Sequence, residues 1–186
     1  MKSIKTIFFL FIVVSISSTT FAGSYKKEYI AELVKQKVLP EYCQYMGFSS
    51  GAGSEKGRLM RKTYGTDWAG THHYCWALVD FKKGFDKQAI GNLNYVLNNS
   101  SKSFKLRPMI LLKKATILSI NKQYYESAKT YNEVIEISPD SELAYVGLSH
   151  IFKSQGDFES ARMLLQKGLR HIPSSRILKE KLESFR

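Results

Sequence analysis

The chain lacks several features that would point directly to one class of protein. No apolar run reaches the roughly 18 to 20 residues that a helix needs to span a bilayer. Only 2 of the 186 residues are cysteine, which is too few for a small scaffold built on disulfides. Charged residues make up 24% of the chain and hydrophobic residues 44%, so wholesale disorder and collagen-like structure are excluded. This length and composition fit one domain with a hydrophobic core.

Motifs of the common enzyme classes are also missing. The chain has no His-Glu-x-x-His helix and no phosphate-binding loop, and its one Gly-x-Ser-x-Gly match, residues 47–51, follows no predicted strand as a nucleophile elbow would. The glycine-rich stretch 51–57 follows no predicted strand and has the wrong glycine spacing for phosphate, so we expect a loop there. Neither the redox motif Cys-x-x-Cys nor the haem-attachment motif Cys-x-x-Cys-His occurs. We therefore predict a protein that is not an enzyme and that needs no cofactor or metal.

The N-terminal segment 1–22 has the pattern of a secretory signal peptide. Lys2 and Lys5 precede the apolar stretch 7–14, and Thr20 and Ala22 place small side chains at the two positions that a signal peptidase reads. Cleavage after Ala22 would leave a mature chain with no transmembrane segment, located in the periplasm or outside the cell. An uncleaved anchor is the alternative, although an apolar core of about ten to twelve residues is short for one.

The whole chain has a formal net charge of +12, and the positive charge is concentrated in its first half. Residues 23–125 contain 17 Lys and Arg against 7 Asp and Glu, whereas residues 126–186 contain 9 of each. This excess either forms a solvated surface or contacts an anionic partner, such as a glycan or a lipid head group. Because we expect export, nucleic acid is not an expected partner.

One pattern of two helices occurs twice in the second half of the chain. Each copy ends at a proline, Pro139 or Pro173, and the distance between these prolines is the repeat interval. In each, a run of residues at spacings of three and four is followed by a short turn and a second such run. In the second copy Ser149 and Ala161 are small where two helices would approach closely, and Gly156 would end the first helix. The matched positions are Leu111, Ala115, Leu118, Tyr124, Ser127, Tyr131, Val134 and Ile135, then Tyr145, Leu148, Phe152, Phe158, Ala161, Leu165, Gly168 and Leu169. Both copies resemble the tetratricopeptide repeat, a hairpin of two helices.

The resemblance implies an all-α fold, a right-handed superhelical stack of about three such hairpins between a disulfide-linked N-terminal helix and a C-terminal capping helix. Gly84, Phe85, Ala89 and Leu93 repeat the second-helix pattern in a divergent first unit. The predicted segments are the signal peptide 1–22, an N-terminal helix and loop 23–67 (helix 28–38, loop 47–67), repeats 68–101, 108–141 and 142–173, and the capping helix 174–186.

The two cysteines, Cys43 and Cys75, lie in the N-terminal segment and in the first repeat helix. In an oxidising compartment the simplest expectation is a disulfide between them, which would fasten this segment to the stack. A zinc site that also uses His72 and His73 is the alternative, since zinc accepts this set of ligands. Adjacent residues of a helix point about 100° apart, however, so the two histidines are poorly placed to share one ion.

Tetratricopeptide proteins bind peptides or protein surfaces in a concave groove lined by the first helix of each repeat. Carried over residue by residue, the resemblance places ten side chains in this groove: Tyr74, Leu78, Phe81, Met109, Leu112, Thr116, Ser119, Val146, His150 and Lys153. The set of Lys, Arg and Asn with which one subgroup clamps a C-terminal carboxylate is not reproduced. Together with the leader, the resemblance implies a non-catalytic scaffold for protein–protein interaction in a bacterial cell envelope. An anionic envelope polymer as partner, or a place in an envelope assembly or secretion system, are the alternatives.

Overall fold

The computed structural model describes residues 25–46 and 52–185, and all regular structure in these two ranges is helical. This agrees with the predicted all-α class. The elements are α1 (Lys27–Lys35), η1 (Glu41–Tyr45), α2 (Glu55–Tyr64), η2 (Gly65–Gly70), α3 (His72–Lys82), α4 (Asp86–Asn98), α5 (Arg107–Ile120), α6 (Tyr124–Ile137), α7 (Glu142–Ser154), α8 (Phe158–His171) and α9 (Arg176–Glu183); η1 and η2 are 3-10 helices. The predicted signal peptide, residues 1–22, lies outside the described residues.

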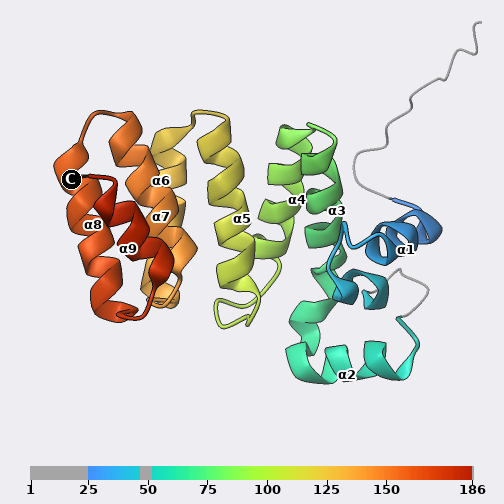
Figure 1. Cartoon of the computed structure of the whole chain (residues 1–186). Helices are drawn as coiled ribbons and strands as arrows, with labels where there is room; N and C mark the ends of the chain where they lie inside the picture. The colour runs from blue at the N-terminus through green and yellow to red at the C-terminus, as the bar shows by residue number, and fades with distance from the viewer. Residues whose placement is uncertain (1–24, 47–51, 186) are drawn as a thin grey trace, which may run out of the picture.

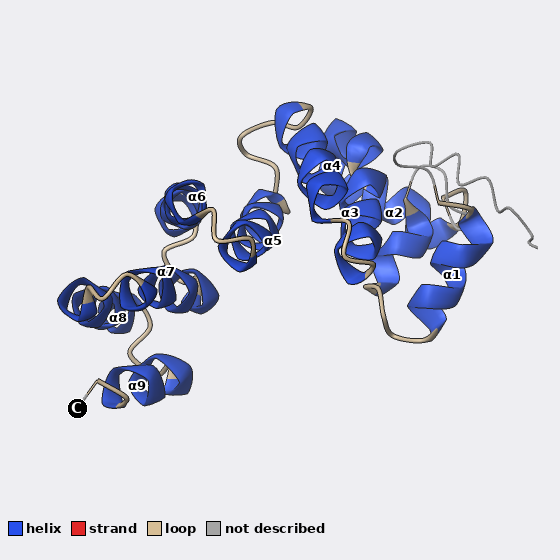
Figure 2. Ribbon diagram, turned by 90° about the horizontal axis from the view of Figure 1, so that it is seen from above, coloured by secondary structure: helices blue, strands red, loops and turns tan. Residues whose placement is uncertain are grey.

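The helices from α3 to α9 stack side by side in an arc, with α1 and α2 at the α3 end (Figure 1). Consecutive helices form the hairpins α3–α4, α5–α6 and α7–α8. Seen from above, α3, α5, α7 and α9 follow the inner side of the arc, and α4, α6 and α8 lie outside them (Figure 2). Among the described helices, none combines the length and apolar character that crossing a membrane requires.

The three hairpins turn in the same way. The second residue after each first helix has positive φ: Gly84 at 77°, Lys122 at 57° and Gly156 at 81°. At each turn the next amide donates back into the helix, as from Asp157 N to Phe152 O at 3.0 Å, which satisfies a terminal carbonyl. The last two turns, at Lys122 and Gly156, are separated by the same number of residues as Pro139 and Pro173. The first two turns lie farther apart, because additional residues connect α4 to α5.

Small residues let the paired helices approach each other. Ala115 and Ser127 are fully buried, and the Ser127 hydroxyl donates to the Ala115 carbonyl at 2.7 Å across the α5–α6 hairpin. Ala161 and Leu165 of α8 are equally buried, as the spacing of apolar residues predicts. One continuous core therefore runs from the N-terminal segment through all three hairpins.

Two local predictions near the N-terminus were wrong. Within the predicted loop 47–67, residues 55–64 form α2, because the Ser54 hydroxyl accepts from the Gly57 amide at 3.1 Å and caps the helix; η2 follows directly. Residues 47–51 lie outside the described part of the chain. The helix predicted over 28–38 ends at Lys35, since Lys37 takes a φ of 57° and the Val38 amide turns back to Leu33 O.

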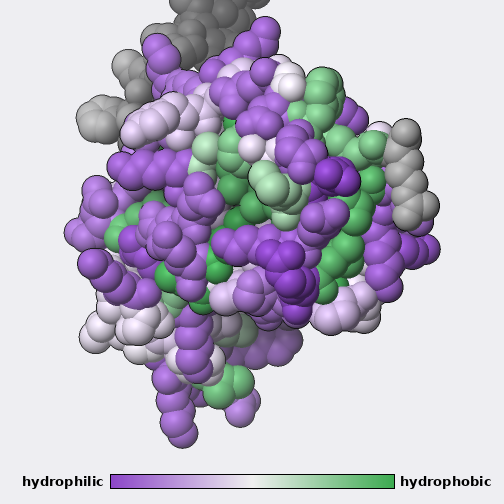
Figure 3. All heavy atoms as spheres, turned by 90° about the vertical axis from the view of Figure 1, so that its left-hand side faces the viewer, coloured by the Kyte–Doolittle hydropathy of each residue, from purple (hydrophilic) through white to green (hydrophobic). Residues whose placement is uncertain are grey.

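The C-terminal helix α9 covers the end of the stack, as predicted. Leu178 is fully buried against α7 and α8, and a Cβ placed on Gly168 would lie 2.9 Å from its Cδ1 atom. The Ser175 hydroxyl accepts from the Leu178 amide at 3.0 Å and also contacts the Glu142 carboxylate. Hydrophilic side chains cover most of the surface at this end of the molecule (Figure 3), which keeps a terminal repeat soluble.

Candidate peptide-binding groove

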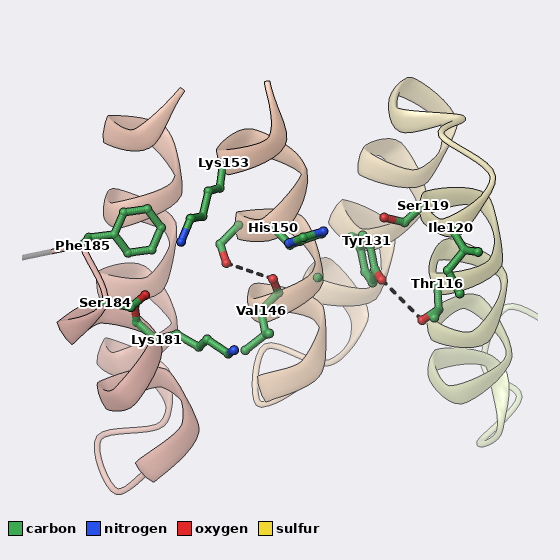
Figure 4. A pocket seen from close by; sticks show the side chains of 12 residues that line it. Thr116, Ser119, Ile120, Tyr131, Val146, His150, Lys153, Lys181, Ser184 and Phe185 are labelled. Atoms are coloured by element: carbon green, nitrogen blue, oxygen red, sulfur yellow. Dashed lines mark hydrogen bonds between the residues drawn. The ribbon is translucent and has the colours of Figure 1, made fainter. Parts of the chain in front are cut away.

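A cavity of about 390 Å³ opens on the inner side of the arc between α5, α7 and α9 (Figure 4). The residues that line it are Thr116, Ser119, Ile120, Tyr131, Val146, Gly147, Ser149, His150, Lys153, Lys181, Ser184 and Phe185. Both apolar side chains and hydroxyl groups line this surface. The cavity can therefore hold an extended segment through both van der Waals contact and hydrogen bonds.

Tyr131 enters the cavity from α6 and closes it on the side away from solvent. Its ring packs directly on Gly147, where a Cβ atom would lie 2.6 Å from the Tyr131 Cε1 atom. The Thr116 hydroxyl donates to the Leu112 carbonyl at 2.8 Å, so the Tyr131 hydroxyl donates to Thr116 Oγ1 over 3.3 Å. Burial raises the pKa of Tyr131, so this hydroxyl remains protonated.

The charged groups of the cavity are all basic. Lys153 and Lys181 direct their side chains into the space between α7 and α9 (Figure 4), and the Lys153 ammonium lies 4.9 Å from the centre of the Phe185 ring. Neither lysine forms an ion pair within the described residues. No Asp or Glu is among the lining residues. Such a surface favours a ligand with a carboxylate close to an apolar side chain.

Five of the predicted groove residues line this cavity: Thr116, Ser119, Val146, His150 and Lys153. Met109 and Leu112 lie on the same face of α5 as Thr116, at helical spacings from it and nearer the start of the helix. Phe81 and Leu78 of α3 are half-buried, and the Lys113 ammonium lies 5.4 Å from the centre of the Phe81 ring. These four residues lie outside the lining of the cavity.

Tyr74 requires a correction, because it does not line an open groove. Its side chain is only 4% exposed and its ring stacks on Tyr42 of η1, with ring centres 6.4 Å apart. Burial raises the pKa of the Tyr74 hydroxyl. The reason for the error is long-range: the resemblance gives Tyr74 a position on a first helix but says nothing about an N-terminal segment that covers it.

The cavity also contains residues that the sequence analysis did not propose. Tyr131 was assigned to the packing of a second helix, and Lys181, Ser184 and Phe185 were assigned to the cap. The repeat interval could have revealed two of these, since it carries Gly147 and His150 onto Lys181 and Ser184. Helix α9 thus occupies the place of the first helix of another repeat.

The two cysteines form a disulfide that joins η1 to α3. Cys43 and Cys75 are bonded, their Cα atoms are 5.8 Å apart, and both side chains are buried. Neither sulfur is therefore available as a thiolate ligand for zinc. Within residues 25–46 and 52–185, no three His, Cys, Asp or Glu side chains come together as a metal site would need.

Comparison with known protein families agrees with the hairpin geometry. A family model for the tetratricopeptide repeat matches residues 110–141, which span most of α5, all of α6 and the turn that follows. The chain contains a tetratricopeptide repeat. Such repeats generally mediate protein–protein interaction, and all-helical tetratricopeptide scaffolds are typically non-catalytic. A search among curated proteins found no match to the chain.

Proposed function

We propose that this tetratricopeptide protein is a non-catalytic adaptor that binds a segment of a protein partner in the cavity between α5, α7 and α9. The observation that carries the proposal is the cavity itself, which lies on the inner side of the stack and is lined from three successive inner helices. Its lysines have no acidic partner in the cavity. The partner segment should therefore carry Asp or Glu next to an apolar or aromatic residue.

The proposal includes export to the cell envelope. The pattern of residues 1–22 supports it, because charged, apolar and small residues follow one another as in a signal peptide. The buried disulfide supports it independently, since structural disulfides persist mainly in oxidising compartments. Cell fractionation followed by N-terminal sequencing tests this part of the proposal. A chain that stays in the cytosol and retains Met1 would contradict it.

The binding proposal is tested by capture followed by mutagenesis. The full chain is cross-linked in the native envelope and its partner is identified by mass spectrometry. Binding of that purified partner is then measured for the wild type, His150→Ala and the double variant Lys153→Ala/Lys181→Ala. We expect both variants to weaken binding by tenfold or so, about 1.4 kcal/mol, while the melting temperature stays unchanged.

The matched control is Lys167→Ala, because Lys167 is exposed on α8, outside the cavity. It removes one lysine charge, where the double variant removes two, and should leave binding unchanged. Equal affinities for the wild type and for both cavity variants would refute the groove assignment.

The alternative partner is an anionic glycan or lipid head group bound by the basic first half of the chain. Its signature is a steep loss of envelope association with added salt, because surface charges are screened over about 8 Å at physiological ionic strength. Association that depends on salt but not on the cavity lysines would favour this alternative over the groove.

A further inference from the structure

Residues 39–46, which include η1, lie against the inner helices at the α3 end of the stack. Leu39, Cys43 and Met46 of this segment are buried in the common core. Between them, Tyr42 extends toward α3 and α5. Three residues spread along the segment thus anchor it in the fold, although it contains only one short 3-10 helix.

Tyr42 joins two inner helices with one side chain. Its ring stacks on Tyr74 of α3, and its hydroxyl lies 3.7 Å from the sulfur of Met109 of α5. Burial is the main cause that raises the pKa of Tyr42, so its hydroxyl remains protonated and donates to this sulfur. A phenol ring therefore occupies the inner side where α3 and α5 face each other.

Three further contacts fix this segment in place. The Cys43–Cys75 disulfide bonds it to α3 beside Tyr74. The Met46 sulfur lies 3.2 Å from Cys75 Sγ, and both are buried. On the solvent side, the Lys56 ammonium contacts the Glu41 carboxylate at 2.9 Å and so ties the segment to α2.

The repeat register shows what this segment replaces. Tyr74 of α3, Leu112 of α5 and Val146 of α7 occupy equivalent positions. Each lies the same number of residues before the turn that ends its helix, at Gly84, Lys122 and Gly156 respectively. At Val146 the inner side is open and forms the cavity. At Tyr74 the same position is covered by Tyr42. One part of the inner side is therefore empty and the other is filled by the chain itself.

We propose that residues 39–46 are a built-in occupant of the groove between α3 and α5, so that this part is closed and a partner segment can enter only from α5 to α9. The inference depends on the proposed function only in treating the inner side as a binding surface. It also gives the occupied part a chemistry. Without the segment, the surface of Tyr74 and Met109 would accept an aromatic side chain.

Hydroxyl-radical footprinting read by mass spectrometry tests the proposal on the full chain without any partner, so the result does not depend on the cavity being a binding site. In the wild type, Met109 should be oxidised much more slowly than Met163, which is 52% exposed on α8. In Tyr42→Ala, oxidation of Met109 should rise severalfold. In the matched control Tyr42→Phe, which keeps the ring, the rise should be much smaller.

A second variant frees the segment without removing its ring. Cys43→Ser/Cys75→Ser should also increase labelling of Met109 and Tyr74, while labelling of Met163 stays at the wild-type rate. Equal oxidation of Met109 and Met163 in the wild type would overturn the proposal even if both variants unfold. So would unchanged labelling of Met109 in two variants that keep their helical circular dichroism.

Discussion

At the scale of single residues, Gly147 determines the shape of the cavity. Its missing side chain leaves room for the Tyr131 ring, which in turn donates its hydroxyl to Thr116. We predict that Gly147→Ala displaces this ring and destabilises the fold by about 1–3 kcal/mol, because an additional methyl group overpacks the site. Chemical denaturation measures the change in the free energy of unfolding.

The control for this prediction is Gly91→Ala in α4. Apart from its two chain neighbours and the backbone of its own helix, no atom lies within 4 Å of a Cβ atom placed on Gly91. The same substitution should therefore stabilise the chain by up to about 1 kcal/mol through helix propensity. A Gly147→Ala variant that is as stable as Gly91→Ala would mean that Tyr131 does not pack on Gly147.

His72 gives a prediction about pH. Burial, and then the neighbouring His73, lowers the pKa of His72 below its ordinary value. The unfolded chain therefore binds the proton more readily than the folded chain, and stability is full above about pH 6.5 and falls as the pH decreases through that value. Compared with the wild type, His72→Gln should lose less stability between about pH 7.5 and pH 5.

Urea unfolding of both proteins at several pH values measures this difference. His171→Gln is a suitable control for the loss of a histidine, since His171 lies at the end of α8, far along the chain from His72. Parallel pH profiles for the wild type and His72→Gln would show that burial of this ring does not affect its titration.

At the scale of helices, the α7–α8 hairpin depends on the small residue Ala161, which is fully buried. Ala161→Leu should cost about 1–3 kcal/mol, because three additional carbon atoms must fit into a packed interior. Met163→Leu, which replaces one side chain by another of similar volume on the exposed side of α8, should be nearly neutral. Full thermal stability of Ala161→Leu would show that the register of α8 is wrong.

The disulfide gives a second prediction at this scale. Cys43 and Cys75 have a sequence separation of 32, so the loop that they close is worth roughly 3–4 kcal/mol in the chain-entropy account. The variant Cys43→Ser/Cys75→Ser should lose stability of this order in thermal unfolding. A thiol assay on the denatured, unreduced wild type should find no free thiol, and two free thiols would disprove the bond.

The hairpins could be predicted because their signals are local. Turns at Gly84 and Gly156, small residues at the helix contacts and apolar residues at spacings of three and four all lie within one repeat. Helix α2 was missed because its start depends on one hydroxyl cap at Ser54 in a glycine-rich stretch. The burial of Tyr74 was missed because the repeat pattern alone assigned this residue to the groove, although the predicted Cys43–Cys75 disulfide brings Tyr42 next to it.

At the scale of the whole molecule, the ends of the stack are closed by different means. The C-terminal end is covered by α9, which continues the repeat register, with Leu178 buried in the core. The N-terminal end is covered by residues 25–46 and 52–70, which follow no repeat, and the first of these segments is held by a covalent bond. Each repeat in such an array contacts only its neighbours, so the two end repeats need cover to resist fraying.

The long arc also separates charge in space. The excess of Lys and Arg lies in residues 23–125, whereas the rest of the chain is balanced. The part of the arc from α1 to α5 is therefore positively charged, whereas the part from α6 to α9 is balanced. A negatively charged surface would attract the α1–α5 part first and orient the protein as it approaches, which leaves α7, α8 and α9 free to meet a second molecule.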